Sequence, residues 1–218
     1  MLKLTDVPTE QVSAITDLVL AVLALFIFLY FIRPEFKSGW KRNCWICFFG
    51  VMFIVGLLGS VIHGFQIAGP ERIFMWHVLF FSLGLFLVSF TLAIIGDLAG
   101  ERISRKLLPY IFLIGLIFYF IAVSRIDGFI VFVGYQALVM IPVVIGYTWM
   151  GFRGRLPGAW YMVVGGLISL LAVVLQVRTA LEFTFVWTFN HNSLYHLVQT
   201  IGVLFFFAGI RKSLRASI

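Results

Sequence analysis

The sequence predicts an all-α integral membrane protein, a single domain over residues 1–218 that folds as a bundle of seven transmembrane helices. Of the 218 residues, 62% are hydrophobic and only 11% are charged, which is too little polar surface to cover a soluble fold. Seven apolar stretches come close to the roughly 20 residues that a helix needs to cross the hydrocarbon layer. The basic residues also gather in the connections on one side of this bundle, as they do in membrane proteins.

The seven stretches use most of the chain and leave no room for a soluble module. We expect helices over residues 15–31, 44–63, 73–95, 107–123, 129–149, 160–177 and 191–210. The first stretch follows Asp6 and Glu10, and no small-residue cleavage site occurs between it and Arg33. We therefore expect an uncleaved helix there and not a signal peptide.

Glycine, proline and aromatic positions add detail to three of these elements. Gly56 and Gly59 predict that the second helix packs closely against a neighbour. Pro142 predicts a kink in the fifth helix. The connector over residues 178–190 is longer than the others, and its aromatic run at 183–189 is suited to lying along the membrane interface.

The distribution of basic residues predicts how the bundle is oriented. Connections on the N-terminal side carry four of the 16 Lys and Arg residues, namely Lys3, Arg72, Arg125 and Arg178. The other twelve lie on the C-terminal side. The positive-inside rule then places the C-terminus in the cytoplasm and the N-terminus outside, in a bacterial inner membrane or a eukaryotic endomembrane. The net charge of +7 thus reflects topology, and we expect no nucleic-acid partner.

All four histidines fall on the N-terminal side of the predicted bundle. His63 ends the second stretch, His77 begins the third, and His191 and His196 begin the seventh. Imidazole binds metals and carries protons, and an ionisable group at membrane depth indicates a functional site. Asp17 lies on the same side, where it either faces a partner inside the bundle or complements the dipole of the first helix.

The seventh stretch opens with the densest polar cluster in the chain. Asn192, His196 and Gln199 are spaced i, i+4 and i+7, so they line one face of a helix. His191 and His196 are five residues apart, and their side chains point in directions that differ by about 140° on a helix. Both can bind one ion only if His191 lies in a non-helical turn.

Three imidazoles and one water molecule form a known catalytic zinc site. The predicted ligands are His63, His77 and His196, one from each of three helices, with His191 as a further candidate. Zinc is the expected metal, although imidazole also suits iron, manganese and nickel.

The same side of the bundle offers candidates for catalysis. Ser60 is three residues from His63 and shares its face, so it could hydrogen-bond a metal-bound water or an oxyanion. Asp17 or Glu182 could supply the carboxylate that acts as a general base or orients an imidazole. A site near one membrane face is open to lipids from the side, which favours a lipid ester or amide as substrate.

These residues resemble the alkaline ceramidase and progestin/adipoQ receptor superfamily, whose members are zinc-dependent lipid amidases or their relatives. The resemblance covers the seven-helix topology and a few motif residues. Ser60 and His63 would match the superfamily's helix-2 pair, and Asn192 and His196 its helix-7 His-x-x-x-His motif. The resemblance implies a zinc-dependent intramembrane hydrolase with a membrane lipid as substrate.

The chain also departs from that pattern at three points. Ser60 and His63 are spaced Ser-x-x-His where the superfamily has Ser-x-x-x-His, and Asn192 stands where it has a histidine. Its helix-3 Asp is missing, and His77 occupies roughly that region. The resemblance therefore supports a metal site in this chain better than it supports amidase activity.

Two other functional classes remain open at this stage. The histidines would serve as relay groups in a proton-coupled transporter or channel, which predicts polar residues that continue through the bundle. Two of them on facing helices would also suit a b-type haem protein. A retinal protein is excluded because no lysine lies inside a predicted span. The sequence does not indicate an oligomeric state.

Overall fold

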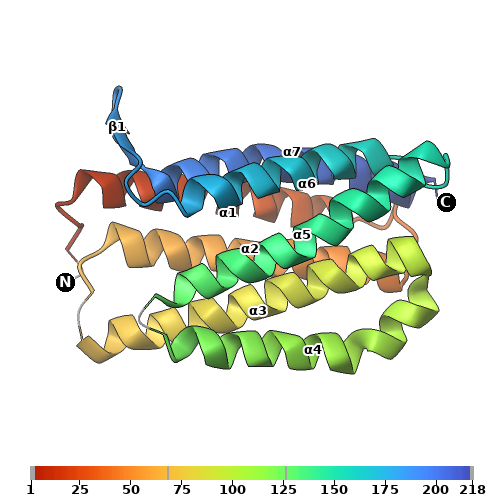
Figure 1. The fold of residues 1–218 in the computed structure, drawn as a ribbon, viewed down its shortest axis with the longest axis horizontal. Coiled ribbons are helices and arrows are strands. Elements are labelled where there is room, and N and C mark those ends of the chain that lie inside the picture. Colours follow the sequence, from red (N-terminus) through yellow and green to blue (C-terminus); the bar gives the residue numbers. More distant parts are fainter. Residues whose placement is uncertain (1–2, 68, 126, 217–218) are drawn as a thin grey trace.

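The computed structural model describes residues 3–67, 69–125 and 127–216 and confirms the seven-helix bundle (Figure 1). Within these ranges, seven helices are long and apolar enough to cross a membrane. Their bounds are α1 Pro8–Phe31, α2 Trp40–Gly64, α3 Gly69–Ala99, α4 Glu101–Val123, α5 Gly128–Phe152, α6 Ala159–Gln176 and α7 His191–Arg215. Two short strands, β1 Glu182–Thr184 and β2 Thr188–Asn190, lie between α6 and α7.

Most of the helices are longer than the apolar stretches that predicted them. Helix α1 begins at Pro8, seven residues before the first apolar stretch, because proline suits the first turn of a helix and Glu10 complements the dipole there. Helix α7 continues to Arg215 with basic residues in its last turn. Hydropathy locates the part of a helix inside the hydrocarbon, whereas hydrogen bonds and capping set where the helix ends.

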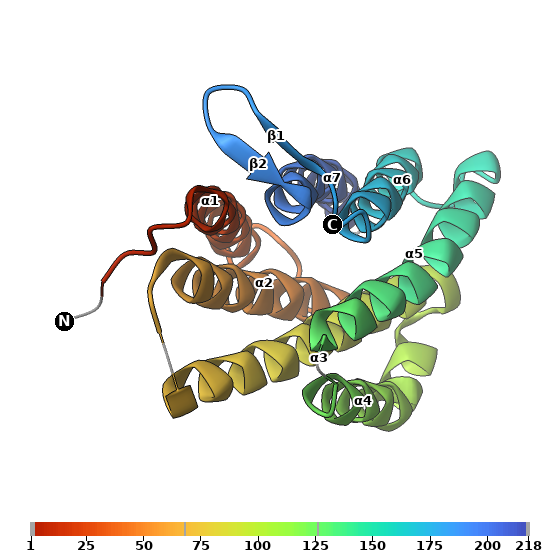
Figure 2. The same ribbon diagram turned by 60° about the vertical axis from the view of Figure 1, so that its left-hand side comes forward.

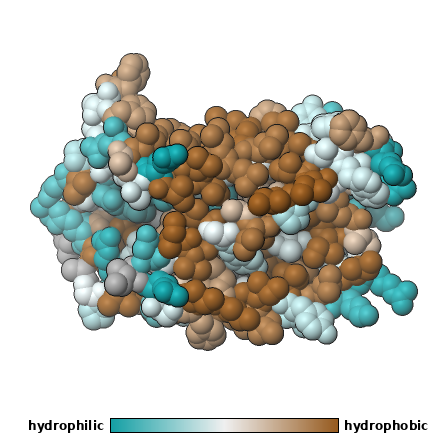
Figure 3. Space-filling model, viewed as in Figure 1, coloured by the Kyte–Doolittle hydropathy of each residue, from teal (hydrophilic) through white to brown (hydrophobic). Residues whose placement is uncertain are grey.

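Helix α3 is the most buried of the seven and packs against α2, α4 and α5, whereas α4 is the least buried and lies at the periphery (Figure 2). Helix α1 packs against α2 and α7, and α6 packs between α5 and α7. The two termini lie at opposite ends, as an odd number of spans requires (Figure 1). Apolar side chains form a broad band around the middle of the bundle, and polar side chains gather at both ends (Figure 3). This band is the surface that would face lipid.

The α6–α7 connector forms a β-hairpin, which the sequence analysis did not predict. Apolar and polar residues alternate from Phe183 onward, which is a strand signal. The sequence analysis interpreted the same residues only as an aromatic run at the membrane interface. Helix α5 continues through Pro142 without interruption.

The end of the bundle opposite the histidines is held by a buried ion pair. Lys41 of α2 pairs with Asp97 of α3, and the hydroxyl of Tyr147 on α5 donates a hydrogen bond of 2.7 Å to the other carboxylate oxygen. Lys41 also donates to Ser213 of α7. Asp97 thus has its charge partner, Lys41, within the bundle. A charge at this depth is stable only when it is paired in this way.

Close packing of α1 against α2 depends on Gly56, as predicted. A Cβ atom at this position would lie 2.9 Å from the Cβ of Ala21 and 2.9 Å from the backbone oxygen of Asp17. Real Cβ atoms do not approach other atoms this closely, so any larger residue must push the two helices apart.

We therefore expect Gly56→Ala to lower the free energy of unfolding by about 1–3 kcal/mol because it overpacks the α1–α2 interface. Gly134→Ala on α5 is the matched control, since a Cβ there meets nothing within 4 Å. Thermal unfolding in detergent measures both variants. Equal melting temperatures for the two would show that the interface is not as tight as this structure has it.

Candidate functional site

A cavity of about 280 Å³ opens at the end of the bundle where α1 and α7 begin and α2 ends, which we call the histidine end. Its inner wall is apolar and includes Leu20, Met52, Leu83 and Phe86. Polar side chains line the part nearer the helix ends. They are Glu10, Asp17, His63, Asp127, Gln176, Thr179, Asn190, His191, Asn192, Tyr195, His196 and Gln199. The cavity is thus amphipathic, as a site for a lipid headgroup and part of its chain must be.

The start of α7 is fixed by a capping box. The side chain of Asn190 accepts from the backbone N–H of Ser193, and the Ser193 hydroxyl accepts from the backbone N–H of Asn190. Ser13 of α1 donates to the same Asn190 oxygen at 3.2 Å, which ties the two helices together. With the helix start fixed here, Asn192, His196 and Gln199 all line the cavity, as their spacing predicts.

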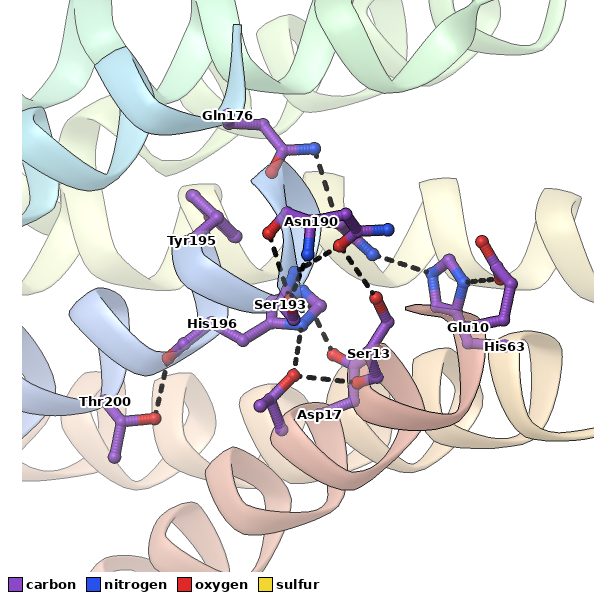
Figure 4. A network of polar contacts seen from close by, with 12 residues as sticks. Glu10, Ser13, Asp17, His63, Gln176, Asn190, Ser193, Tyr195, His196 and Thr200 are labelled. Atoms are coloured by element: carbon purple, nitrogen blue, oxygen red, sulfur yellow. Dashed lines mark hydrogen bonds and ion pairs between the residues drawn. The ribbon is translucent and has the colours of Figure 1, made fainter. Parts of the chain in front are cut away.

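His196 and Asp17 form a buried pair between α7 and α1 (Figure 4). The Nε2 atom of His196 lies 3.3 Å from a carboxylate oxygen of Asp17, and its Nδ1 atom lies 3.2 Å from the hydroxyl oxygen of Thr16. That hydroxyl donates to the backbone oxygen of Ser13. In the tautomer that carries its proton on Nδ1, the imidazole donates to Thr16 and turns the lone pair of Nε2 toward the Asp17 carboxyl group.

Gly59 of α2 makes room for the Asp17 carboxyl group. A Cβ atom at position 59 would lie 2.6 Å from the Asp17 Oδ2 atom. This oxygen has no hydrogen-bond partner among the described residues, although it is buried. Asp17 also lines the cavity, so its carboxyl group combines a buried, unpartnered oxygen with a position at the cavity wall.

A second histidine–carboxylate pair lies nearer the end of the bundle (Figure 4). The Nδ1 atom of His63 lies 2.6 Å from a carboxylate oxygen of Glu10, and its Nε2 atom accepts from the side-chain amide of Asn192 at 3.2 Å. Gln176 of α6 donates in turn to the Asn192 oxygen at 3.3 Å. This chain of contacts connects α1, α2, α7 and α6 across the cavity.

Deeper in the bundle, a network of neutral side chains extends the polar wall. Tyr195 donates to the Gln136 oxygen at 2.7 Å, Gln136 donates to Gln199 at 3.1 Å, and Gln199 donates to Ser169 at 3.1 Å. All four residues are buried. Beyond this level, the rings of Phe48, Phe86 and Phe90 pack with centroids 4.7–4.9 Å apart.

The structure brings some of the predicted site residues together and separates others. Asp17, His63, His191 and His196 line the cavity, and the Nδ1 atom of His191 has no partner among the described residues. His77 does not line it. Its Nδ1 atom lies 3.4 Å from the hydroxyl of Tyr119 on the peripheral helix α4.

The two other catalytic candidates also lie outside the lining of the cavity. Ser60 is half-buried on α2, and Glu182 is exposed on the hairpin. Two further carboxylates, which the sequence analysis did not select, join Asp17 at the cavity: Asp127 and, paired with His63, Glu10. The signal for Glu10 was present, because Glu10, Ser13 and Asp17 are spaced i, i+3 and i+7 and share one face once α1 is known to begin at Pro8.

No three His, Cys, Asp or Glu side chains stand close enough together to share a metal ion in the part of the chain that the structure describes. His63 and His196 nonetheless resemble metal ligands in one respect. The Nδ1 atom of His63 contacts Glu10, and that of His196 contacts Thr16. The Nε2 atom of each ring therefore points toward another residue that lines the cavity, as in a ring held for metal binding. A metal bound here would require side chains to move together from the positions described.

The fold and the site define a class of protein: a seven-helix membrane protein with a histidine-lined amphipathic cavity at one end. The chain belongs to the DUF6962 family, described as a family of unknown function, which matches residues 12–215. No curated protein and no solved structure matches the chain. The resemblance to the alkaline ceramidase and progestin/adipoQ receptor superfamily therefore stays a prediction.

We expect Gln136→Leu to lower the free energy of unfolding by roughly 0.6–1.7 kcal/mol, the range found for hydrogen bonds between membrane helices. The substitution leaves the Tyr195 hydroxyl and the Gln199 oxygen without their partner. Leu138→Ala on the same helix is the control, since Leu138 is exposed to the surrounding medium. If Gln136→Leu is no less stable than this control, the network does not hold α5 to α7.

Proposed function

We propose that the chain hydrolyses an ester or amide bond of a membrane lipid that enters the cavity at the histidine end. The observation that carries this proposal is the combination of an amphipathic cavity with two histidine–carboxylate pairs on its polar wall. Hydrolysis requires a group that takes a proton from water and returns one to the leaving atom. The carboxyl group of Asp17 and the imidazole of His196 lie 3.3 Å apart and both residues line the cavity, so they are the groups that would exchange these protons.

The charges of the lining favour one class of headgroup. Glu10, Asp17 and Asp127 contribute carboxyl groups, and none of the described lining residues is Lys or Arg. A phosphate or a free carboxylate would find no cationic partner there and would be repelled. The amide side chains of Asn192 and Gln176 can donate and accept hydrogen bonds. The proposed substrate is therefore a lipid with a neutral or cationic head.

The same geometry argues against a transporter or channel. The polar network ends at Gln199 and Ser169, and aromatic packing around Phe48 and Phe90 follows. Beyond that packing lies the Lys41–Asp97 ion pair, which holds α2 to α3. Proton transfer between the two ends would require a continuous polar connection. The polar side chains in this region of the described chain are Ser89, which donates to the backbone oxygen of Phe86, and Thr91, and neither is hydrogen-bonded to the network around Gln199. With the C-terminus in the cytoplasm, as the basic residues predict, the cavity opens on the opposite face.

Zinc belongs to the proposal as a cofactor still to be tested. His63 and His196 would hold it through Nε2, with Asp17 or His191 as the third ligand. Bound zinc would supply a more acidic water and polarise the substrate carbonyl. The chain's own contribution is the same in either case: Thr16 and Glu10 orient the two imidazoles.

Substitutions at the deeper pair test the hydrolase. We expect Asp17→Asn and His196→Gln each to lower turnover by about 10²–10⁴-fold, because each removes a group that exchanges protons at the cavity. His77→Gln is the matched control, since His77 contacts Tyr119 outside the cavity. The measurement is release of a fluorescent fatty acid from N-acyl and O-acyl amphiphiles with hydroxyl or amine heads. Wild-type turnover in Asp17→Asn would remove Asp17 from the mechanism.

Metal content separates the two forms of the proposal. If zinc binds, mass spectrometry of detergent-purified protein should find about one zinc per chain, lost in His63→Ala and His196→Ala. The sequence analysis counted His77 among the predicted ligands, whereas the geometry predicts that His77→Ala keeps its metal. Hydrolysis by a protein without zinc would assign the proton transfers to the Asp17–His196 pair alone.

A further inference from the structure

The hairpin between α6 and α7 has two chemically different faces. Phe183 and Phe189 lie opposite each other in the antiparallel register, and their rings stack with centroids 5.5 Å apart. Thr184 and Thr188 form the next pair, and their hydroxyl oxygens are 3.1 Å apart. Successive side chains of a strand point to opposite sides, so one face is aromatic and the other carries hydroxyl groups.

The tip of the hairpin is apolar and uncovered. Phe185, Val186 and Trp187 are 84%, 68% and 63% exposed. The hairpin stands out from the bundle at the histidine end and runs across the direction of the helices (Figures 1 and 2). A two-stranded hairpin is only marginally stable in water, and three neighbouring exposed apolar side chains indicate a contact surface.

The direction of the hairpin and its surroundings identify what it contacts. Because it runs across the helices, it lies parallel to the plane of a membrane that the helices cross. Its strand β2 contacts α1 and α7, and each of these helices carries exposed apolar side chains in its first half, such as Ile15 and Leu197. The apolar tip thus continues the lipid-facing surface of the bundle at the depth where tryptophan and phenylalanine are enriched.

We propose that the hairpin over residues 182–190 lies in the interfacial layer of the leaflet at the histidine end, with Phe185, Val186 and Trp187 in contact with lipid. This places lipid next to the cavity, because Thr179 before β1 and Asn190 at the end of β2 both line it. The proposal depends only on the membrane position of the bundle and stands whether or not the cavity hydrolyses lipid.

A fluorescent label at the tip tests the contact. Val186→Cys, in a Cys44→Ala and Cys47→Ala background, would be labelled with an environment-sensitive dye and reconstituted into phosphatidylcholine vesicles. Nitroxide groups on the lipid, near the headgroup or near the chain end, report depth, and aqueous iodide reports exposure to water. Ser38→Cys in the loop at the opposite end is the aqueous control, and Leu113→Cys on the exposed surface of α4 is the deep-lipid control.

The label at position 186 should be quenched about twofold more strongly by the nitroxide near the headgroup than by the one near the chain end, as an interfacial site requires. The label at position 113 should show the reverse order, and the label at position 38 should respond to iodide alone. Iodide quenching at 186 equal to that at 38 would place the tip in water and overturn the proposal. Protection from both iodide and nitroxide would overturn it as well, because a protein, including a second copy of this chain, would then cover the tip.

Discussion

An ionisable side chain inside a bilayer must find its partners within the protein, because no water is present to solvate it. This constraint explains why Asp17 faces His196 and not the lipid, and why Ser13, Thr16 and Asp17 gather on the part of α1 that contacts α7. The contact also decides where the cavity forms. Helix α1 must approach both α2 and α7, and the space left between these helices and α3 is the site.

The two polar regions of the bundle differ in what they leave unsatisfied. At the opposite end, Lys41, Asp97 and Tyr147 satisfy one another, and the group holds α2, α3 and α5 together. At the histidine end, one oxygen of Asp17 and one nitrogen of His191 lack partners among the described residues, and both residues line the cavity. Buried unpartnered atoms also occur away from the cavity, at Trp45 Nε1 and Thr91 Oγ1, so it is the position at the cavity that makes Asp17 and His191 candidates for ligand binding.

Helix number and approximate position could be predicted from the sequence, because crossing a bilayer requires long apolar stretches. The alignment of Asn192, His196 and Gln199 on one face also followed from their spacing. The pairing of histidines with particular carboxylates could not be predicted, since it depends on how far each helix extends and how it is rotated. Glu10 was passed over because α1 was expected to begin after it. His77 was grouped with the other histidines because sequence gives its depth but not the direction in which α3 presents it.

The contact between Gly59 and Asp17 links two positions that are distant in the sequence. The three atoms nearest to a Cβ at position 59 all belong to the Asp17 carboxyl group, so a larger residue there must displace that group from its present position. Within the family, we therefore expect an acid at position 17 to occur together with glycine at position 59. The pair thus offers a criterion, readable from sequence alone, for sorting members that retain this site from members in which only the bundle remains.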